Sequence, residues 1–145
     1  MKAATVYRRC DHIYLHASSK TTAGVWIATP PFINIDCGSS PSHIGKAVLE
    51  ALDGSHTPVP HPTKWNGLIA PLIEQAGVKS WGTFMRKAHC LDLEVAEDRL
   101  KLIPHRNLGA SEGFEPMLES AFDVPSTSSL DQIGTALVEA LALCQ

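Results

Sequence analysis

The sequence predicts a single α+β domain over residues 1–145, built from mainly antiparallel sheet with helices packed on it. Short β-rich segments stand near both ends of the chain, and each group of strands is followed by an amphipathic helix. The chain of 145 residues is 44% hydrophobic, enough to bury a core without disulfides or metals. We therefore expect two similar units, residues 1–55 and 83–145, joined by residues 56–82.

The N-terminal unit begins with a hairpin. Two β-rich segments, Thr5–Arg9 and His12–Ala17, are separated by only two residues, which is the spacing of a tight turn. Two further strands are expected on either side of a Pro-Pro pair, namely Ala23–Thr29 and Phe32–Asp36. Ser40 followed by Pro41 is a helix start, and this helix should end near Asp53.

The middle of the chain is irregular. Residues 54–62 contain several prolines, which cannot donate the backbone hydrogen bonds of a helix or a central strand. Thr63 is a suitable cap for a short helix over Trp65–Ala76, although Pro71 should kink this helix or delay its start, and Gly77 should end it.

The C-terminal unit contains the clearest hairpin. Apolar and polar residues alternate over Cys90–Val95 and again over Arg99–Ile103, with a turn between them. Phe114–Val124 is expected to form one or two short strands. Ser129 and Gln132 form a capping box that opens a helix reaching Cys144.

The two long helices share a motif. Residues 44–52 read IGKAVLEAL and residues 133–141 read IGTALVEAL, with six of nine positions identical. Two interpretations remain open: convergence of amphipathic helices on one composition, or a duplicated unit of four strands and a helix. The strands that precede each helix favour duplication. Gly45 and Gly134 are costly inside helices, which indicates close packing at both positions.

Charge and composition exclude several classes of protein. The net charge of −3 argues against a duplex-binding protein, because affinity for DNA depends on Lys and Arg meeting phosphates. The sequence shows no secretory leader and no apolar run of membrane-spanning length, so we expect a cytoplasmic protein with no membrane partner. The four cysteines are widely spaced and are expected to be reduced.

No catalytic or cofactor motif stands out. The seven histidines have no third ligand at a recognisable spacing, so no metal, no cofactor and no catalytic residues are predicted, and the protein is not expected to be an enzyme. The strand-to-helix turn at Cys37 resembles a nucleophile elbow only in outline, because G-x-S-x-G is absent.

Two sequence features could form binding surfaces. Residues 76–88 combine Trp81 and Phe84 with three cations; they could stack on single-stranded nucleic acid, but core packing with solvated cations is favoured. Acidic residues gather on the second hairpin and just after it, where they could meet a basic partner instead of simply facing solvent. These candidate partner-binding residues are Asp92, Glu94, Glu97, Asp98, Glu112 and Glu115.

Several stretches together resemble a bacterial family, the immunity proteins of contact-dependent growth inhibition (CDI) systems. They are YRR at residues 7–9, SKTTAGVWIATPPF at 19–32, IGKAVLEALDGS at 44–55, VPHPTKW at 59–65, AGVKSWGTFMRKAHC at 76–90, PHRNLG at 104–109 and GFEPM at 113–117. The match spans most of the chain, and its motifs are mostly structural in character.

The resemblance implies a cytoplasmic protein that binds and neutralises the C-terminal toxin domain, often a nuclease, of an effector from a sibling cell. The repeated strand–helix organisation also looks like Whirly-type proteins, so the alternative function is single-stranded nucleic-acid binding. The acidic balance makes nucleic acid the less favoured partner. The oligomeric state is left open by the sequence.

Overall fold

One antiparallel sheet of seven strands organises the chain, and the computed structural model describes all residues from 1 to 145. The strand order is β3-β2-β1-β4-β5, and both β6 and β7 pair with β5. The strands are β1 (Lys2–Arg9), β2 (His12–Lys20), β3 (Trp26–Asp36), β4 (Ala88–Ala96), β5 (Arg99–Asn107), β6 (Phe114–Pro116) and β7 (Phe122–Pro125). The helices are α1 (Pro41–Asp53), α2 (Ala70–Ala76), α3 (Trp81–Met85), the 3-10 turn η1 (Leu118–Ser120) and α4 (Leu130–Leu143). The predicted α+β class is confirmed.

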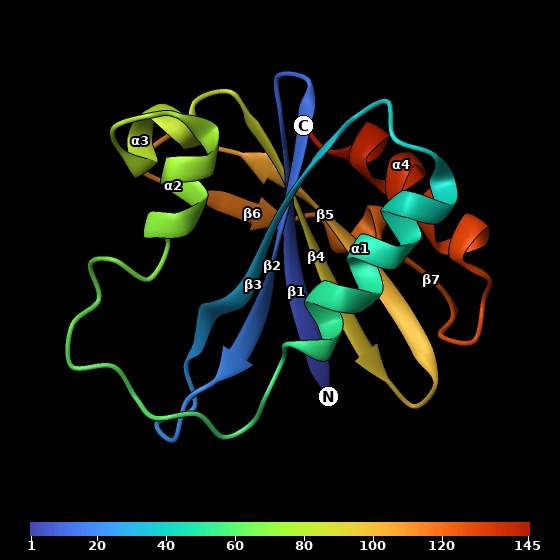
Figure 1. Ribbon diagram of the computed structural model, residues 1–145, viewed down its shortest axis with the longest axis horizontal. Helices are drawn as coiled ribbons and strands as arrows, with labels where there is room; N and C mark the ends of the chain where they lie inside the picture. The colour runs from blue at the N-terminus through green and yellow to red at the C-terminus, as the bar shows by residue number, and fades with distance from the viewer.

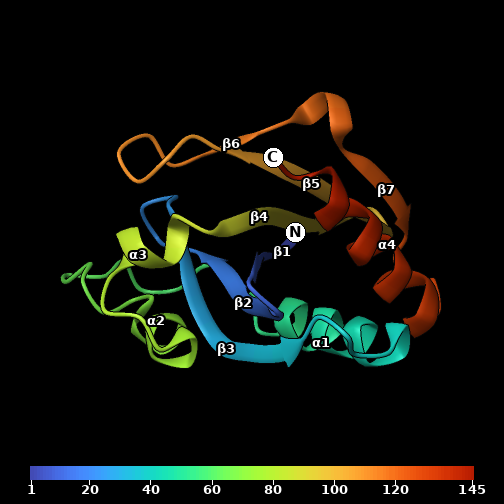
Figure 2. The ribbon, with the colours of Figure 1, turned by 90° about the horizontal axis from the view of Figure 1, so that it is seen from above.

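Helices α1 and α4 lie side by side on one face of the sheet, as Figure 1 shows on the right of the view. Seen from above in Figure 2, the sheet curls around these two helices, and α2 and α3 lie at the other end of the molecule. The main core fills the space between the curled sheet and α1 and α4. It consists of alternate strand residues such as Val6, Leu15 and Leu93 together with the apolar stripes of both helices.

The opposite side of the sheet, here called the outer face, carries a second and smaller core. It is built from Tyr7, Tyr14, Leu72, Phe84, Ala88 and Cys90, with α2 and α3 packed over it. These two short helices cover only part of the outer face. The remaining part is the surface on which the candidate site lies.

The local predictions for both long helices are confirmed. The Ser40 side chain accepts a hydrogen bond from the backbone of His43 at the start of α1, and Ser129 and Gln132 form the capping box of α4. Both hairpins also form as predicted, with β1 paired to β2 and β4 paired to β5. Residues 114–124 contain two short strands separated by η1.

Some element boundaries differ from those expected. The two strands predicted around Pro30 form one strand, β3, because the register shifts between His16 and Ala17 of β2 and absorbs the prolines as an irregularity. The helix expected from Trp65 begins only at Ala70, with Pro71 in its first turn. The first half therefore has three strands before its helix, not the four of the predicted repeat unit.

The two halves nevertheless correspond in arrangement. β1 and β4 pair at the centre of the sheet, and each is followed by the next strand outward through a two-residue turn. The buried positions of α1 recur in α4 at the same spacing, from Ile44 and Ile133 to Leu52 and Leu141. None of the helices is long and apolar enough to span a bilayer.

Candidate functional site

The six acidic residues predicted to bind a partner do not lie in one patch. Asp92 and Glu94 are half-buried on the outer face of β4, because their neighbours Leu91 and Leu93 point into the main core. Glu97 and Asp98 form the exposed turn between β4 and β5, both with positive φ. Glu112 lies in the loop between β5 and β6, and Glu115 lies on β6 opposite Arg106, near the end of β5 that is remote from this turn. Glu94 and the turn acids therefore lie toward one end of β5 and Glu112 and Glu115 toward the other, with Asp92 between them opposite Ile103.

A nearby arginine reduces the negative charge of the group that contains Glu112 and Glu115. Glu115 accepts a salt bridge from Arg106 at 3.4 Å, which offsets its charge. Glu94 lies opposite Lys101 in the β4–β5 ladder but forms no ion pair with it. The hairpin group, made of Asp92, Glu94 and the turn acids, is the more concentrated source of negative charge.

A chain of polar side chains crosses the outer face from β2 to β5. His105 Nε2 donates to Asp92 Oδ2 at 3.1 Å, and the Thr5 hydroxyl donates to Asp92 Oδ1 at 3.2 Å. The Ser18 and Thr5 hydroxyl oxygens are 3.1 Å apart, and because the single Thr5 proton goes to Asp92, Ser18 is the donor. Each oxygen of the Asp92 carboxylate is thus held by its own partner, which fixes its orientation.

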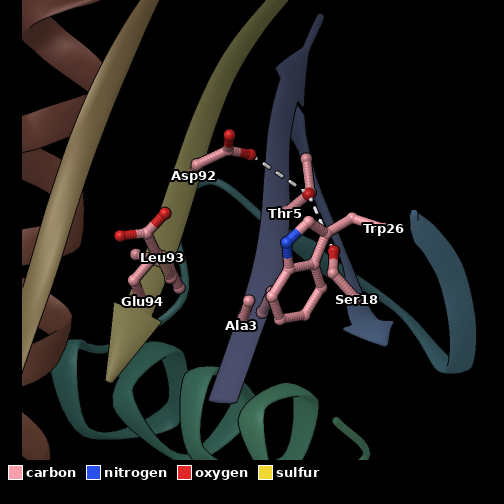
Figure 3. A pocket seen from close by; sticks show the side chains of 8 residues that line it. Ala3, Thr5, Ser18, Trp26, Asp92, Leu93 and Glu94 are labelled. Carbon is pink, nitrogen blue, oxygen red and sulfur yellow. Dashed lines mark hydrogen bonds between the residues drawn. The ribbon is translucent and has the colours of Figure 1, made fainter. Parts of the chain in front are cut away.

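Trp26 borders this polar chain. Figure 3 shows its indole ring lying across β1 next to Ala3 and Thr5, with Asp92 and Glu94 on the β4 side. A shallow depression of about 160 Å³ lies between them, and its lining includes Thr5, Ser18, Trp26, Asp92 and Glu94. The Trp26 residue is 38% exposed although it is a large aromatic, so part of its ring surface is available to a partner.

Two further depressions continue from the first. The second shares Thr5, Ser18 and Trp26 with it and extends over His16 to Trp81, with a volume of about 300 Å³. The third shares Ile69 and Trp81 with the second and reaches Trp65, with a volume of about 570 Å³. We call these three adjoining depressions, lined in turn by Trp26, Trp81 and Trp65, the tryptophan groove.

The floor of the groove near Trp81 is a packed aromatic cluster. Trp81 stacks on Phe84 with ring centroids 5.6 Å apart and meets Tyr7 edge-on at 5.7 Å. Phe84 is completely buried, whereas Lys79, Arg86 and Lys87 are exposed. The prediction of core packing with solvated cations is confirmed for Phe84, and its burial leaves no face on which a base could stack.

The structure also brings together three residues that the sequence analysis did not connect. Donor atoms of Cys90, Asp92 and His105 all lie within 4.8 Å of one another. The predicted hairpin already implied that these residues are close, because a turn centred on Glu97 and Asp98 places residue 90 opposite residue 105. Burial raises the pKa of the Cys90 thiol well above its ordinary value, and electrostatic interactions with Asp92 and Cys144 raise it further.

The side chains of His12, His16 and Cys37, which could in principle carry chemistry, make structural contacts in this fold. His12 contacts Asn34 at 3.0 Å on the exposed side of β2, and buried His16 binds the carbonyl of Ala17 at 2.8 Å. Burial raises the pKa of the Cys37 thiol, with Arg8 opposing the effect, so thiolate formation is disfavoured there.

Comparison with solved structures identifies the fold. A protein of unknown function from Neisseria meningitidis superimposes with a TM-score of 0.81 at 16% identity, covering 99% of this chain and 95% of the other. The CdiA-CT/CdiI toxin and immunity complex from Yersinia pseudotuberculosis gives a TM-score of 0.81 at 19% identity, covering 99% of this chain and 97% of that chain. At these identities the likeness shows a shared fold.

The sequence itself matches no curated protein. It does match a family model described as CDI immunity protein, over residues 61–144. That match runs from the segment before Trp65 to the end of α4 and covers more than half of the chain. The comparisons give no support to single-stranded nucleic-acid binding. The chain belongs to the family of CDI immunity proteins.

Proposed function

We propose that this protein binds the C-terminal toxin domain of its cognate CDI effector through the tryptophan groove and the acidic residues of the β4–β5 hairpin, and thereby neutralises the toxin. One observation carries the proposal: all three tryptophans of the chain line adjoining depressions, which begin on the outer face beside Asp92 and Glu94 and end over α2 and the start of α3.

The groove has the composition expected of a binding surface. Tryptophan is enriched among the few residues that supply most of the binding energy in protein complexes, since it offers a large contact area at little cost in conformational entropy. Trp26 and Trp65 are 38% and 50% exposed, and the aromatic cluster beneath Trp81 holds the floor rigid. A partner can therefore bury both rings without first reorganising the surface.

The acids suit a basic partner. Asp92, Glu94, Glu97 and Asp98 present a negative field at one end of the groove, and such a field accelerates the capture of a positively charged domain. A nuclease toxin fits this description, because its substrate-binding surface must attract phosphates. Glu112 and Glu115 lie at the other end of β5, so we expect them to contribute less to toxin binding.

Neutralisation of this kind requires binding alone. We infer that the protein acts as an inhibitor without a reaction of its own, in the cytoplasm, where an incoming toxin domain would meet it. The rigid sheet, with one face committed to α1 and α4 and the other carrying the groove, is suited to that role.

Co-expression tests the proposal. The toxin domain of the neighbouring effector gene is expressed in a sensitive host, alone and together with this protein, and growth and co-purification are measured. Growth arrest that is relieved only in the presence of this chain, together with a stable complex, is the expected result. Toxicity without rescue and without a complex would contradict the proposal.

A further inference from the structure

We propose that Cys90, Asp92 and His105 form a binding site for a divalent transition-metal ion, with zinc as the best match. The three side chains belong to adjacent strands: Cys90 and Asp92 are two apart on β4, and His105 is on β5. Alternation along β4 puts the first two on the same face, and the ladder puts His105 next to them. Their donor atoms already lie within 4.8 Å of one another.

The donor set is the one that zinc prefers. Zinc in proteins takes thiolate sulfur, imidazole nitrogen and carboxylate oxygen, and calcium and magnesium take oxygen donors. Four donors at ordinary zinc bond lengths are about 3.5 Å apart, so the present separations need only small side-chain rotations to close around an ion. Three protein donors leave a fourth position for water or for a group from a partner.

The surroundings hold these donors in place. Thr5 donates to Asp92 Oδ1 at 3.2 Å, which leaves Oδ2 directed toward His105 at 3.1 Å. Ser18 in turn donates to Thr5. Hydrogen bonds of this kind orient metal-binding carboxylates and tune their affinity for the ion.

A second observation concerns His105. This residue is only 7% exposed, and its Nδ1 atom is buried without any hydrogen-bond partner. Buried polar atoms are almost always satisfied, so an unused ring nitrogen at this position calls for an explanation. Nε2 is the ring nitrogen that faces Asp92, so it is the one that binds the ion, and the free Nδ1 then carries the ring proton.

The site is reachable and its chemistry balances. The Asp92 side chain is 40% exposed and lines the first depression of the tryptophan groove, which gives an ion a route from solvent. The Cys90 thiol loses its proton to solvent as the metal–sulfur bond forms, and the ring proton of His105 shifts from Nε2 to Nδ1 as Nε2 binds the ion, so the imidazole stays neutral. No oxidation or reduction is involved.

The test uses the untagged chain alone, so it does not rest on the proposed function. The protein is treated with chelator, freed of it and titrated with Co²⁺, whose tetrahedral complexes absorb in the visible range and show a thiolate charge-transfer band; Zn²⁺ is then added in competition. The expected result is one cobalt ion per chain with the thiolate band, displaced by zinc. Failure of the wild type to bind either metal would overturn the proposal.

Substitutions test which side chains bind the ion. Cys90→Ser should abolish the charge-transfer band, and Asp92→Asn, which keeps the shape and can still accept from Thr5, should weaken zinc binding. Thr5→Val should reduce affinity about 10- to 100-fold through the orientation of Asp92. Cys10→Ser and His56→Gln are matched controls, because both residues are exposed and lie outside the cluster.

Binding that persists unchanged in Cys90→Ser, Asp92→Asn and His105→Gln would mean an adventitious ion only and would overturn the proposal. Circular dichroism checks that each variant is folded. If Cys90→Ser does not fold, Asp92→Asn at the half-exposed position decides the question.

Discussion

Gly45 in α1 and Gly134 in α4 occupy corresponding positions, and each lies against the backbone carbonyl of the first residue of the other helix. Gly45 contacts Leu130, and Gly134 contacts Pro41. A methyl group at either position would overlap that carbonyl group. The two glycines therefore set how closely α1 and α4 approach over the main core.

Gly45→Ala and Gly134→Ala should each destabilise the protein by about 1–3 kcal/mol, because the overlap is with backbone that cannot rotate away. The helix propensity of alanine would by itself add about 1 kcal/mol of stability. Urea unfolding measures the balance. Gly38→Ala is the matched control, since nothing lies within 4 Å of its added methyl group. An increase in stability for either helix variant would show that the helices are free to move apart.

The aromatic cluster should divide into a buried member and a surface member. Phe84→Ala should cost about 3–5 kcal/mol of unfolding free energy, because Phe84 is completely buried. Trp81→Ala should cost less, since Trp81 is only partly buried at the edge of the same cluster. Denaturant unfolding of both variants checks the order. A larger loss for Trp81 than for Phe84 would be inconsistent with the packing described above.

The charge of the β4–β5 hairpin should govern the rate of toxin capture. Replacement of Glu94, Glu97 and Asp98 by Lys should lower the association rate constant with the toxin domain by about tenfold or more at low salt. The dissociation rate should change less. Stopped-flow or surface-based kinetics at several ionic strengths measure both.

A charge-matched control is available on other surfaces. Glu50, Glu119 and Glu139 are exposed on α1, η1 and α4, and their replacement by Lys changes the net charge equally. If this control slows association as much as the hairpin variant does, the effect comes from net charge and the hairpin does not face the toxin.

His16 should make stability depend on pH. Burial lowers the pKa of His16 below its ordinary value of 6.5, although the Ala17 carbonyl and the charge of Asp92 oppose the effect. The unfolded chain therefore binds a proton between the ordinary and the lowered pKa while the folded chain does not. Stability contributed by neutral His16 is complete above about pH 7 and should fall as the pH drops below 6.5.

Denaturant unfolding between pH 7.5 and roughly 5 measures this slope. His16→Gln should reduce the slope, and His56→Gln at an exposed position should leave it unchanged. Equal slopes in wild type and His16→Gln would assign the acid sensitivity to other groups. One such group is His89, whose pKa is also lowered, first by burial and then by Arg8.

Elements that are determined by residues close together in the sequence were predictable from it. Short sequence patterns specify the Ser40 and Ser129 caps, the two tight hairpins and the apolar stripes of α1 and α4. The pairing of β1 with β4 was not predictable in the same way. It joins residues about 85 positions apart, as in Val6 and Leu91, and no local pattern specifies such a partner.

The residues of the candidate site also divide into those that local sequence predicts and those that depend on pairing between distant segments. Asp92 and Glu94 were identified from charge along one strand, and both line the groove. Trp26 was missed as a surface residue, because its position next to Thr5 depends on how β3 folds beside β2 and β1. The cluster of Cys90, Asp92 and His105 was within reach, since the hairpin turn alone sets the register that brings residues 90 and 105 together.

The most direct test of the account is the affinity of the purified toxin domain for Trp26→Ala, compared with wild type and with Val138→Ala, by titration calorimetry. Val138 is 47% exposed on α4, away from the tryptophan groove. We predict that Trp26→Ala weakens binding by about 2 kcal/mol or more, roughly 30-fold, with little loss of folding stability, and that Val138→Ala binds like the wild type. Wild-type affinity in Trp26→Ala, or an equal loss in both variants, would contradict the assignment of the groove as the toxin-binding surface.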